Sequence, residues 1–174
     1  MTQARGFTLI ESIVVIVVMG IAMLTITSFL VPQVSRSADP HYQTRAAAMG
    51  QSVMTKILAR NFDDVIDVSE GIVTCTASGA NQCTLAGSFG IESGETNNNP
   101  DTYNDVDDFQ GCWEPLATNG CRDLNLLVGG NSYLNFRVDV AVTYAVTNQL
   151  KRVSLTVSAS NQTPIVLNAY RGNY

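Results

Sequence analysis

Apolar residues in this chain gather in one long run near the N-terminus. Residues 7–31 contain Glu11 and no other formally charged side chain. About 25 helical residues extend roughly 38 Å at ~1.5 Å per residue, which is enough to cross a bilayer with some tilt. The run therefore predicts a membrane-spanning helix over residues 7–31.

A second helical stretch is predicted beyond two prolines. Pro32 and Pro40 bracket a segment that should bend or interrupt the helix, so we expect residues 32–40 to form a kink or linker. From His41, apolar residues recur at helical spacing, which predicts an amphipathic helix over 41–60 that packs on a sheet. The apolar stripe consists of Tyr42, Ala46, Met49, Val53, Met54, Ile57 and Leu58.

Strict alternation marks the last third of the chain. Apolar residues alternate with polar or small ones from Leu134 to Val146 and again from Val153 to Ala159, on either side of a turn at 147–149. Such alternation is typical of half-buried strands. The pattern predicts a long antiparallel hairpin, to which residues 164–170 add a last strand.

The remaining residues give a weaker pattern. Short strands are expected at 71–76 and 83–89, and residues 90–108 have the composition of a loop. A long helix followed by an antiparallel sheet is an α+β fold. The length of 174 residues fits one globular domain beside the membrane segment, so we expect residues 41–174 to form one head, β-rich over 71–174.

Charge and motifs exclude two classes of function. The chain has 10 Lys and Arg against 15 Asp and Glu, and nucleic-acid binding needs clustered cations that are absent here. Lys151 and Arg152 form the only adjacent basic pair, and the basic residues that stand singly are expected on a solvated face. His41 is the single histidine, and no Ser or Cys stands in a recognisable nucleophile motif. The sequence therefore predicts neither a nucleic-acid partner nor an enzyme.

Four cysteines lie beyond the apolar run. An even number in an exported region predicts two disulfides, whereas a zinc site would need paired spacings that are missing here. Four cysteines allow three connectivities. Closeness in sequence favours Cys75 with Cys83 and Cys112 with Cys121.

An acidic stretch in the expected loop offers a candidate metal site. Asp101, Asn104, Asp105, Asp107 and Asp108 fall within eight positions, and oxygen ligands at this density suit Ca²⁺. The spacing is not that of an EF-hand loop. A solvated acidic loop, or aspartates that cap turns, is the alternative, and no other cofactor is predicted.

Aromatic residues flank this acidic stretch. Tyr103, Phe109 and Trp113 stand close to the first cysteine of the Cys112 to Cys121 segment. Core packing is the simpler interpretation for three large apolar side chains. A carbohydrate-facing surface is the alternative.

The flanks of the apolar run indicate an orientation. Arg5 precedes the run and no dense basic cluster follows it, which places the N-terminus in the cytoplasm and residues 32–174 outside. A cleaved secretory signal is not favoured, because the run is too long and its nearest candidate cleavage site, at Ser35 to Ser37, is weak.

Glu11 is costly inside an apolar helix. Thr8 and Glu11 fit the S/T-x-x-E capping box, which would satisfy free amide groups at a helix start. Near mid-bilayer, however, a carboxylate costs roughly 2.5 to 3.5 kcal/mol on insertion scales. An ionisable group in such a helix is best interpreted as functional, with a partner that compensates its charge.

The stretch RGFTLIESIVVIVVMGI resembles the class III leader of type IV pilins and pseudopilins. In that family a prepilin peptidase cuts after the glycine, here Gly6, and methylates the new terminus, here Phe7. The resemblance implies that Glu11 pairs with the Phe7 amine of a neighbouring subunit, which removes two uncompensated charges from an apolar bundle. The implied partners are the peptidase, other pilin subunits, an inner-membrane assembly platform and the lipid bilayer.

Three functions fit this resemblance. The first is a minor type IV pilin, similar to those of mannose-sensitive haemagglutinin (MSHA) systems, that is held in the inner membrane and then enters or primes an adhesive surface pilus. The second is a type II secretion pseudopilin. The third is an anchored periplasmic binding domain that never polymerises.

Overall fold

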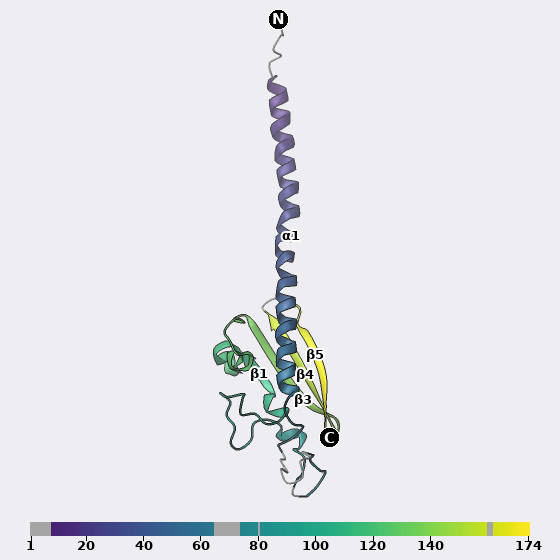
Figure 1. Cartoon of the computed structure of the whole chain (residues 1–174). Coiled ribbons are helices and arrows are strands. Elements are labelled where there is room, and N and C mark those ends of the chain that lie inside the picture. Colours follow the sequence, from purple (N-terminus) through teal and green to yellow (C-terminus); the bar gives the residue numbers. More distant parts are fainter. Residues whose placement is uncertain (1–7, 65–73, 80, 160–161) are drawn as a thin grey trace. The chain divides into compact units, whose positions relative to one another are not determined.

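The computed structural model describes residues 8–64, 74–79, 81–159 and 162–174. The chain divides into two compact units, Met1–His41 and Tyr42–Tyr174, which are described separately. Helix α1, Leu9–Leu58, contributes residues to both units (Figure 1). We call the second unit the head.

Helix α1 continues through the segment between the two prolines. The predicted interruption at residues 32–40 is therefore wrong. A proline removes one backbone amide donor and crowds the preceding turn, which favours a bend. The hydrogen bonds of the neighbouring turns are sufficient to carry the helix across the segment.

The apolar part of α1 is exposed in the described part of the chain. Among the described residues, Leu9–Val31 is the one helical stretch long and apolar enough to cross a membrane, as judged by length and composition. All of its side chains are exposed. An apolar surface of this extent is normally covered by lipid or by another protein.

The head contains a five-stranded sheet in the order β2-β1-β3-β4-β5 (Figure 1). Strands β1 and β2 are parallel and the other neighbours are antiparallel. The strands are β1 (Gly111–Glu114), β2 (Arg122–Asp123), β3 (Phe136–Val146), β4 (Leu150–Ala159) and β5 (Ile165–Gly172). The predicted α+β layout of a long helix and an antiparallel sheet is confirmed.

The β3–β4 hairpin follows the predicted alternation. Phe136, Val138, Val140 and Val142 of β3 are buried while their neighbours are half-buried or exposed. The alternation ends before the turn, since Val146 is exposed and the pairing shifts register between Tyr144 and Val146. Asn148 takes a left-handed backbone conformation at the turn (φ 57°), which asparagine tolerates better than most residues.

The described residues between α1 and β1 form only short helices and isolated bridges. Short helices occur at η1 (Ala86–Ser88) and η2 (Asp107–Phe109); η3 (Pro115–Gly120) and α2 (Leu124–Val128) follow β1 and β2. The predicted strand at 83–89 is wrong, because this segment contains η1 and no ladder. The predicted strand at 71–76 falls partly outside the described residues, and Thr76 forms only an isolated bridge with Gln82.

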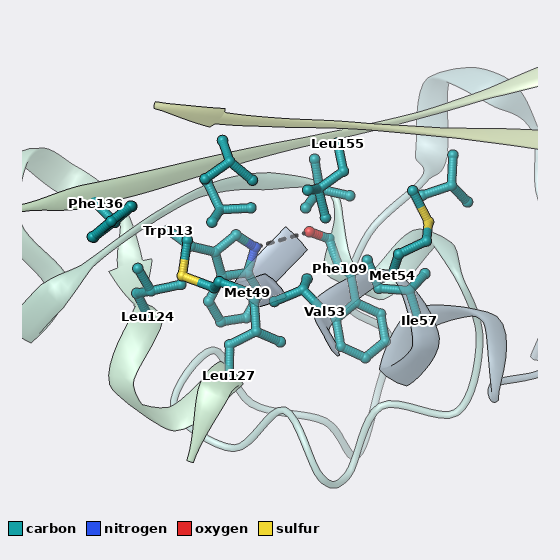
Figure 2. Packing of buried hydrophobic residues seen from close by; sticks show 14 of the residues in the cluster. Met49, Val53, Met54, Ile57, Phe109, Trp113, Leu124, Leu127, Phe136 and Leu155 are labelled. Atoms are coloured by element: carbon teal, nitrogen blue, oxygen red, sulfur yellow. Dashed lines mark hydrogen bonds between the residues drawn. The ribbon is translucent and has the colours of Figure 1, made fainter. Parts of the chain in front are cut away.

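The core of the head lies between α1 and the sheet (Figure 2). Met49, Val53 and Ile57 of α1 are almost fully buried, as the helical spacing predicts. Gly50 lets the helix approach the sheet closely: a Cβ built there would lie 2.8 Å from Leu167 Cδ1 and 3.2 Å from a Val157 methyl carbon. A larger residue at position 50 would have to push the sheet away.

Candidate functional site

The N-terminal site predicted from the sequence is described only in part. Gly6 and Phe7 lie outside the described residues. Thr8 directly precedes α1, and its carbonyl accepts hydrogen bonds from the amides of Glu11 (3.1 Å) and Ser12 (3.2 Å). Glu11 thus lies in the first turn, where a carboxylate also interacts favourably with the helix dipole.

Glu11 is exposed within a stretch that is otherwise apolar. In the part of the chain that the structure describes, no cation forms an ion pair with its carboxylate. In lipid or in a helix bundle, no described residue would therefore compensate the charge of Glu11.

The five residues of the predicted calcium loop do not converge on one point. Asp101 is exposed and pairs with Lys56 at 2.9 Å, and the ion pair lowers the pKa of Asp101. The side-chain amide of Asn104 donates to Asp64 Oδ1 at 2.6 Å. The three other residues, Asp105, Asp107 and Asp108, are 0% exposed. A solvated acidic loop is therefore wrong for these three aspartates.

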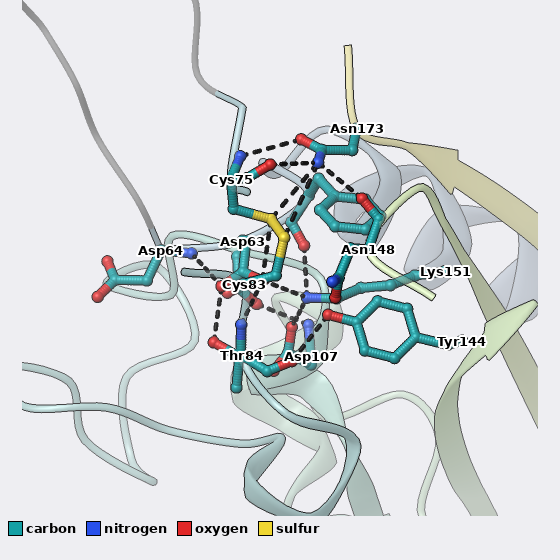
Figure 3. Close-up of polar contacts among 12 residues, drawn as sticks. Asp63, Asp64, Cys75, Cys83, Thr84, Asp107, Tyr144, Asn148, Lys151 and Asn173 are labelled. Carbon is teal, nitrogen blue, oxygen red and sulfur yellow. Dashed lines mark hydrogen bonds and ion pairs between the residues drawn. A yellow bond between two sulfur atoms is a disulfide. The ribbon is translucent and has the colours of Figure 1, made fainter. Parts of the chain in front are cut away.

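Lys151 lies at the centre of a buried polar network (Figure 3). Its ammonium group donates to the Phe62 carbonyl at 2.6 Å, pairs with Asp107, and lies 3.5 Å from Asp63 Oδ2. It also lies 4.8 Å from the ring centre of Phe62 and 4.9 Å from that of Phe89. Lys151 is 0% exposed, which is rare for a lysine unless its charge is paired.

Asp63 connects the same network to the neighbouring loop. Its two oxygens accept hydrogen bonds from the Thr84 amide at 2.9 Å and hydroxyl at 2.7 Å. The Asn173 side chain accepts from the Cys75 amide at 3.1 Å and donates to the Cys75 and Asn148 carbonyls, each at 2.8 Å. These hydrogen bonds fix Cys75 and Thr84, which lie in the two segments where strands were expected. They satisfy backbone polar groups there without strand pairing.

The disulfides join sequence neighbours, the connectivity that the sequence favoured. Cys75 is bonded to Cys83 and Cys112 to Cys121. Each bridge closes a short loop, and such loops contribute about 2 to 3 kcal/mol in the chain-entropy account.

The aromatic residues next to Cys112 belong to the core. Tyr103, Phe109 and Trp113 are almost fully buried, and the Trp113 indole donates to the Phe109 carbonyl at 3.1 Å (Figure 2). The guanidinium of Arg122 lies 4.1 Å from the Trp113 ring centre and donates to the Tyr103 hydroxyl at 2.9 Å. Because these rings are covered, the carbohydrate-facing alternative is wrong.

Two glutamates that the sequence analysis missed join the buried aspartates. Carboxylate oxygens of Glu92, Glu95 and Asp108 form one close group, and those of Glu92, Asp105 and Asp107 form another. We call these five residues the acidic cluster. Burial is the largest cause that raises the pKa of Glu92 to about 9, and the neighbouring Asp108 is the next largest. Burial, followed by the charge of Asp107, raises the pKa of Asp105 to about 10.

The combination of a long apolar helix and a five-stranded α+β head is a type IV pilin-like layout. Residues 1–27 match the family model described as the prokaryotic N-terminal methylation motif. This match supports a pilin-like prepilin leader and a structural subunit of the kind that prepilin peptidase processes. Neither the curated proteins nor the solved structures compared with this chain gave a match.

Proposed function

We propose that this protein is a minor type IV pilin. The chain is cut between Gly6 and Phe7, methylated at Phe7, and held in the inner membrane by residues 7–31 with the head in the periplasm. It then enters or primes an extracellular pilus that serves attachment, as in MSHA-type systems. The single observation that carries the proposal is an exposed apolar helix, Leu9–Val31, that contains one carboxylate and overlaps the methylation motif matched over residues 1–27.

Assembly follows from the physical chemistry of that helix. In the membrane its apolar side chains contact lipid, and in a filament they contact the same helices of other subunits. Cleavage creates an amine at Phe7, and the Glu11 carboxylate of a neighbouring subunit neutralises it in the bundle. The pair also defines an axial register, because either charge is costly unless the two meet.

Mass spectrometry of the mature protein tests processing. We expect an N-terminal N-methyl-Phe7. An intact Met1, or a terminus near Ala38 from ordinary signal cleavage, would contradict the proposal.

Replacement of Glu11 tests assembly. Glu11→Ala should leave membrane insertion intact or improved, because a charge is removed from the apolar run, and should lower incorporation into filaments by tenfold or more. Ser12→Ala, the next residue in the same helical turn, is the matched control and should assemble normally. Unchanged incorporation of the Glu11 variant would overturn the proposed pairing.

The same measurements separate the alternatives. A type II secretion pseudopilin would be processed identically but would restore secretion, rather than surface pili, when supplied to a deletion strain. An anchored binding domain would remain in the membrane fraction with or without Glu11.

A further inference from the structure

The acidic cluster places five carboxylates in a small volume of the head. One oxygen each from Glu92, Glu95 and Asp108 lies within 4.8 Å of the others, and the same holds for Glu92, Asp105 and Asp107. Glu92 belongs to both groups. Distances of this size are those of oxygens that surround a common ion, since Ca²⁺ binds its ligands at about 2.3 to 2.6 Å.

The cluster contains buried oxygens without a hydrogen-bond donor. Asp105 Oδ2, Asp107 Oδ2 and Asp108 Oδ1 have no partner, and neither do the two carboxylate oxygens of Glu92. The three aspartates are 0% exposed. A buried charged oxygen without a partner is costly, so these atoms point to a ligand that supplies positive charge.

The other oxygens of the cluster are held in place by the backbone. Asp108 Oδ2 accepts from the amides of Asn104 (3.0 Å) and Asp105 (2.9 Å). Asp105 Oδ1 accepts from the Asp107 amide at 2.7 Å, and Glu95 Oε1 accepts from the Asn104 amide at 2.9 Å. In each of these two aspartates one oxygen is held by backbone amides and the other is left without a donor. Both oxygens of Glu95 are held, since Oε2 accepts from the Glu92 amide at 3.3 Å.

Nearby cations do not neutralise the cluster. Lys151 pairs with Asp107 and also lies 3.5 Å from Asp63 Oδ2, which is outside the cluster. Arg122 donates to the backbone carbonyls of Asp108 and Gln110 and to the Tyr103 hydroxyl, not to a carboxylate. Five carboxylates therefore share one ammonium group among the described residues.

We propose that the acidic cluster binds a calcium ion in the head, with Glu92 as the central ligand and Asp105, Asp107, Asp108 and Glu95 around it. This ligand set differs from the one that the sequence suggested. Asp101 is excluded by its exposure and its ion pair with Lys56, and two glutamates from the preceding loop are added. The cluster lies wholly within the head, so the proposal is independent of the pilin function.

Protonation of the carboxyl groups is the competing explanation. Burial and mutual repulsion raise the pKa values of Glu92 and Asp105, so protons can occupy the cluster instead of a metal. The two explanations differ in a measurable way, because calcium must displace those protons when it binds.

The test uses the full-length protein in detergent after removal of metals with EDTA. Isothermal titration with CaCl₂ at pH 7.5 should give one site with a Kd below about 1 mM and release of protons to the buffer. At a hundredfold excess over Kd, the Tm should rise by roughly 5 °C or more. Equimolar MgCl₂ should give a smaller rise. Absence of both heat and Tm shift with calcium would overturn the proposal.

Two variants show where the ion binds. Glu92→Gln should weaken calcium binding at least tenfold, while its metal-free Tm should equal or exceed that of the parent because repulsion is relieved. Asp101→Asn, an exposed aspartate of the same loop, is the matched control and should bind calcium like the parent. Loss of binding in Asp101→Asn, or normal binding in Glu92→Gln, would show that the cluster is not the site. If Glu92→Gln does not fold, Glu95→Gln replaces it with the same expectation.

Discussion

The apolar half of α1 and the head both place charge among apolar residues, but they handle that charge differently. In the head, Lys151 is fully buried and contacts Asp63, Asp107 and the Phe62 carbonyl. In the helix, Glu11 stands among exposed apolar side chains and forms no ion pair with any described residue. Lys151 has its counter-charges within the head, whereas in the proposed assembly another subunit supplies the counter-charge of Glu11.

This difference separates a folding problem from an assembly problem. The head's charges belong to the free energy of folding, so their replacement should change stability. In the proposed assembly Glu11 acts between chains, so its replacement should change incorporation and leave the head as it was. The following variants test that separation, from the largest expected effect to the smallest.

Removal of the buried ammonium group should have the largest effect. Lys151→Met leaves Asp63 and Asp107 without their cation, and breaking a buried pair costs about 3 to 5 kcal/mol. We expect the Tm of the head to fall by about 10 °C or more. Fluorescence of the single, buried Trp113 reports this unfolding in the full-length protein.

Arg137→Met is the matched control for that variant. Arg137 also pairs with two carboxylates, those of Glu114 (3.1 Å) and Asp139 (2.7 Å), but its side chain is 43% exposed. Exposed pairs contribute about 0 to 1 kcal/mol, so its Tm should change little. Equal losses in the two variants would show that burial does not govern the contribution of Lys151.

Replacement of two glycines of α1 tests the same comparison, with a smaller expected effect on stability. Gly50→Val should destabilise the head by about 1 to 3 kcal/mol, because the new side chain overlaps Leu167 and Val157 of the sheet. Gly20→Val is the control, since a Cβ at Gly20 meets nothing within 4 Å. Urea unfolding of the head should distinguish them. A destabilised Gly20 variant would contradict the independence of the two regions.

The smallest effect concerns pH in the absence of divalent cations. Glu92 faces Asp107, Asp108 and Glu95, and burial together with these groups raises its pKa to about 9. A carboxyl group with a raised pKa stabilises the fold fully below its unfolded pKa of ~4.3, and this contribution is lost as the pH rises through the folded pKa. The Tm should therefore fall by a few degrees between pH 5 and pH 9.

The other groups with shifted pKa values either change stability in the same direction between pH 5 and pH 9 or act outside this pH range. Asp105 faces Asp107, Asp108 and Lys151 and has a pKa raised to about 10, and Glu95 has one raised to about 7. Glu114 accepts hydrogen bonds from Thr118 and Asn119, which lower its pKa, so its contribution is lost only as the pH falls below its unfolded pKa of ~4.3. Saturating calcium should flatten the profile. A Tm that rises steadily from pH 5 to pH 9 without metal would contradict this account.

Local periodicity made most of the fold predictable. The buried stripe of Met49, Val53 and Ile57 and the β3–β4 hairpin both follow from spacing alone, because each burial pattern repeats with the geometry of its element. Even the burial of Lys151 was visible in principle, since it stands in phase with Val153 and Leu155.

The errors arose where distant segments meet. The expected strand at 83–89 is absent because the Thr84 amide donates to Asp63, 21 residues away in sequence, instead of to a neighbouring strand. The acidic cluster combines Glu92 and Glu95 with residues 105–108, and no spacing rule relates two loops that are brought together by tertiary contacts. Gly6 and Phe7 remain predictions from the motif.

The buried triad of Asp63, Asp107 and Lys151 also constrains how this sequence can diverge. Loss of Lys151 leaves two buried carboxylates without a cation, and loss of both aspartates leaves a buried ammonium group without an anion. Joint replacement by apolar residues of similar volume is often tolerated. In related chains these three positions should therefore change together, so that two acids and one base are either all kept or all lost. An alignment of such chains would reveal the triad as correlated substitutions between positions up to 88 residues apart.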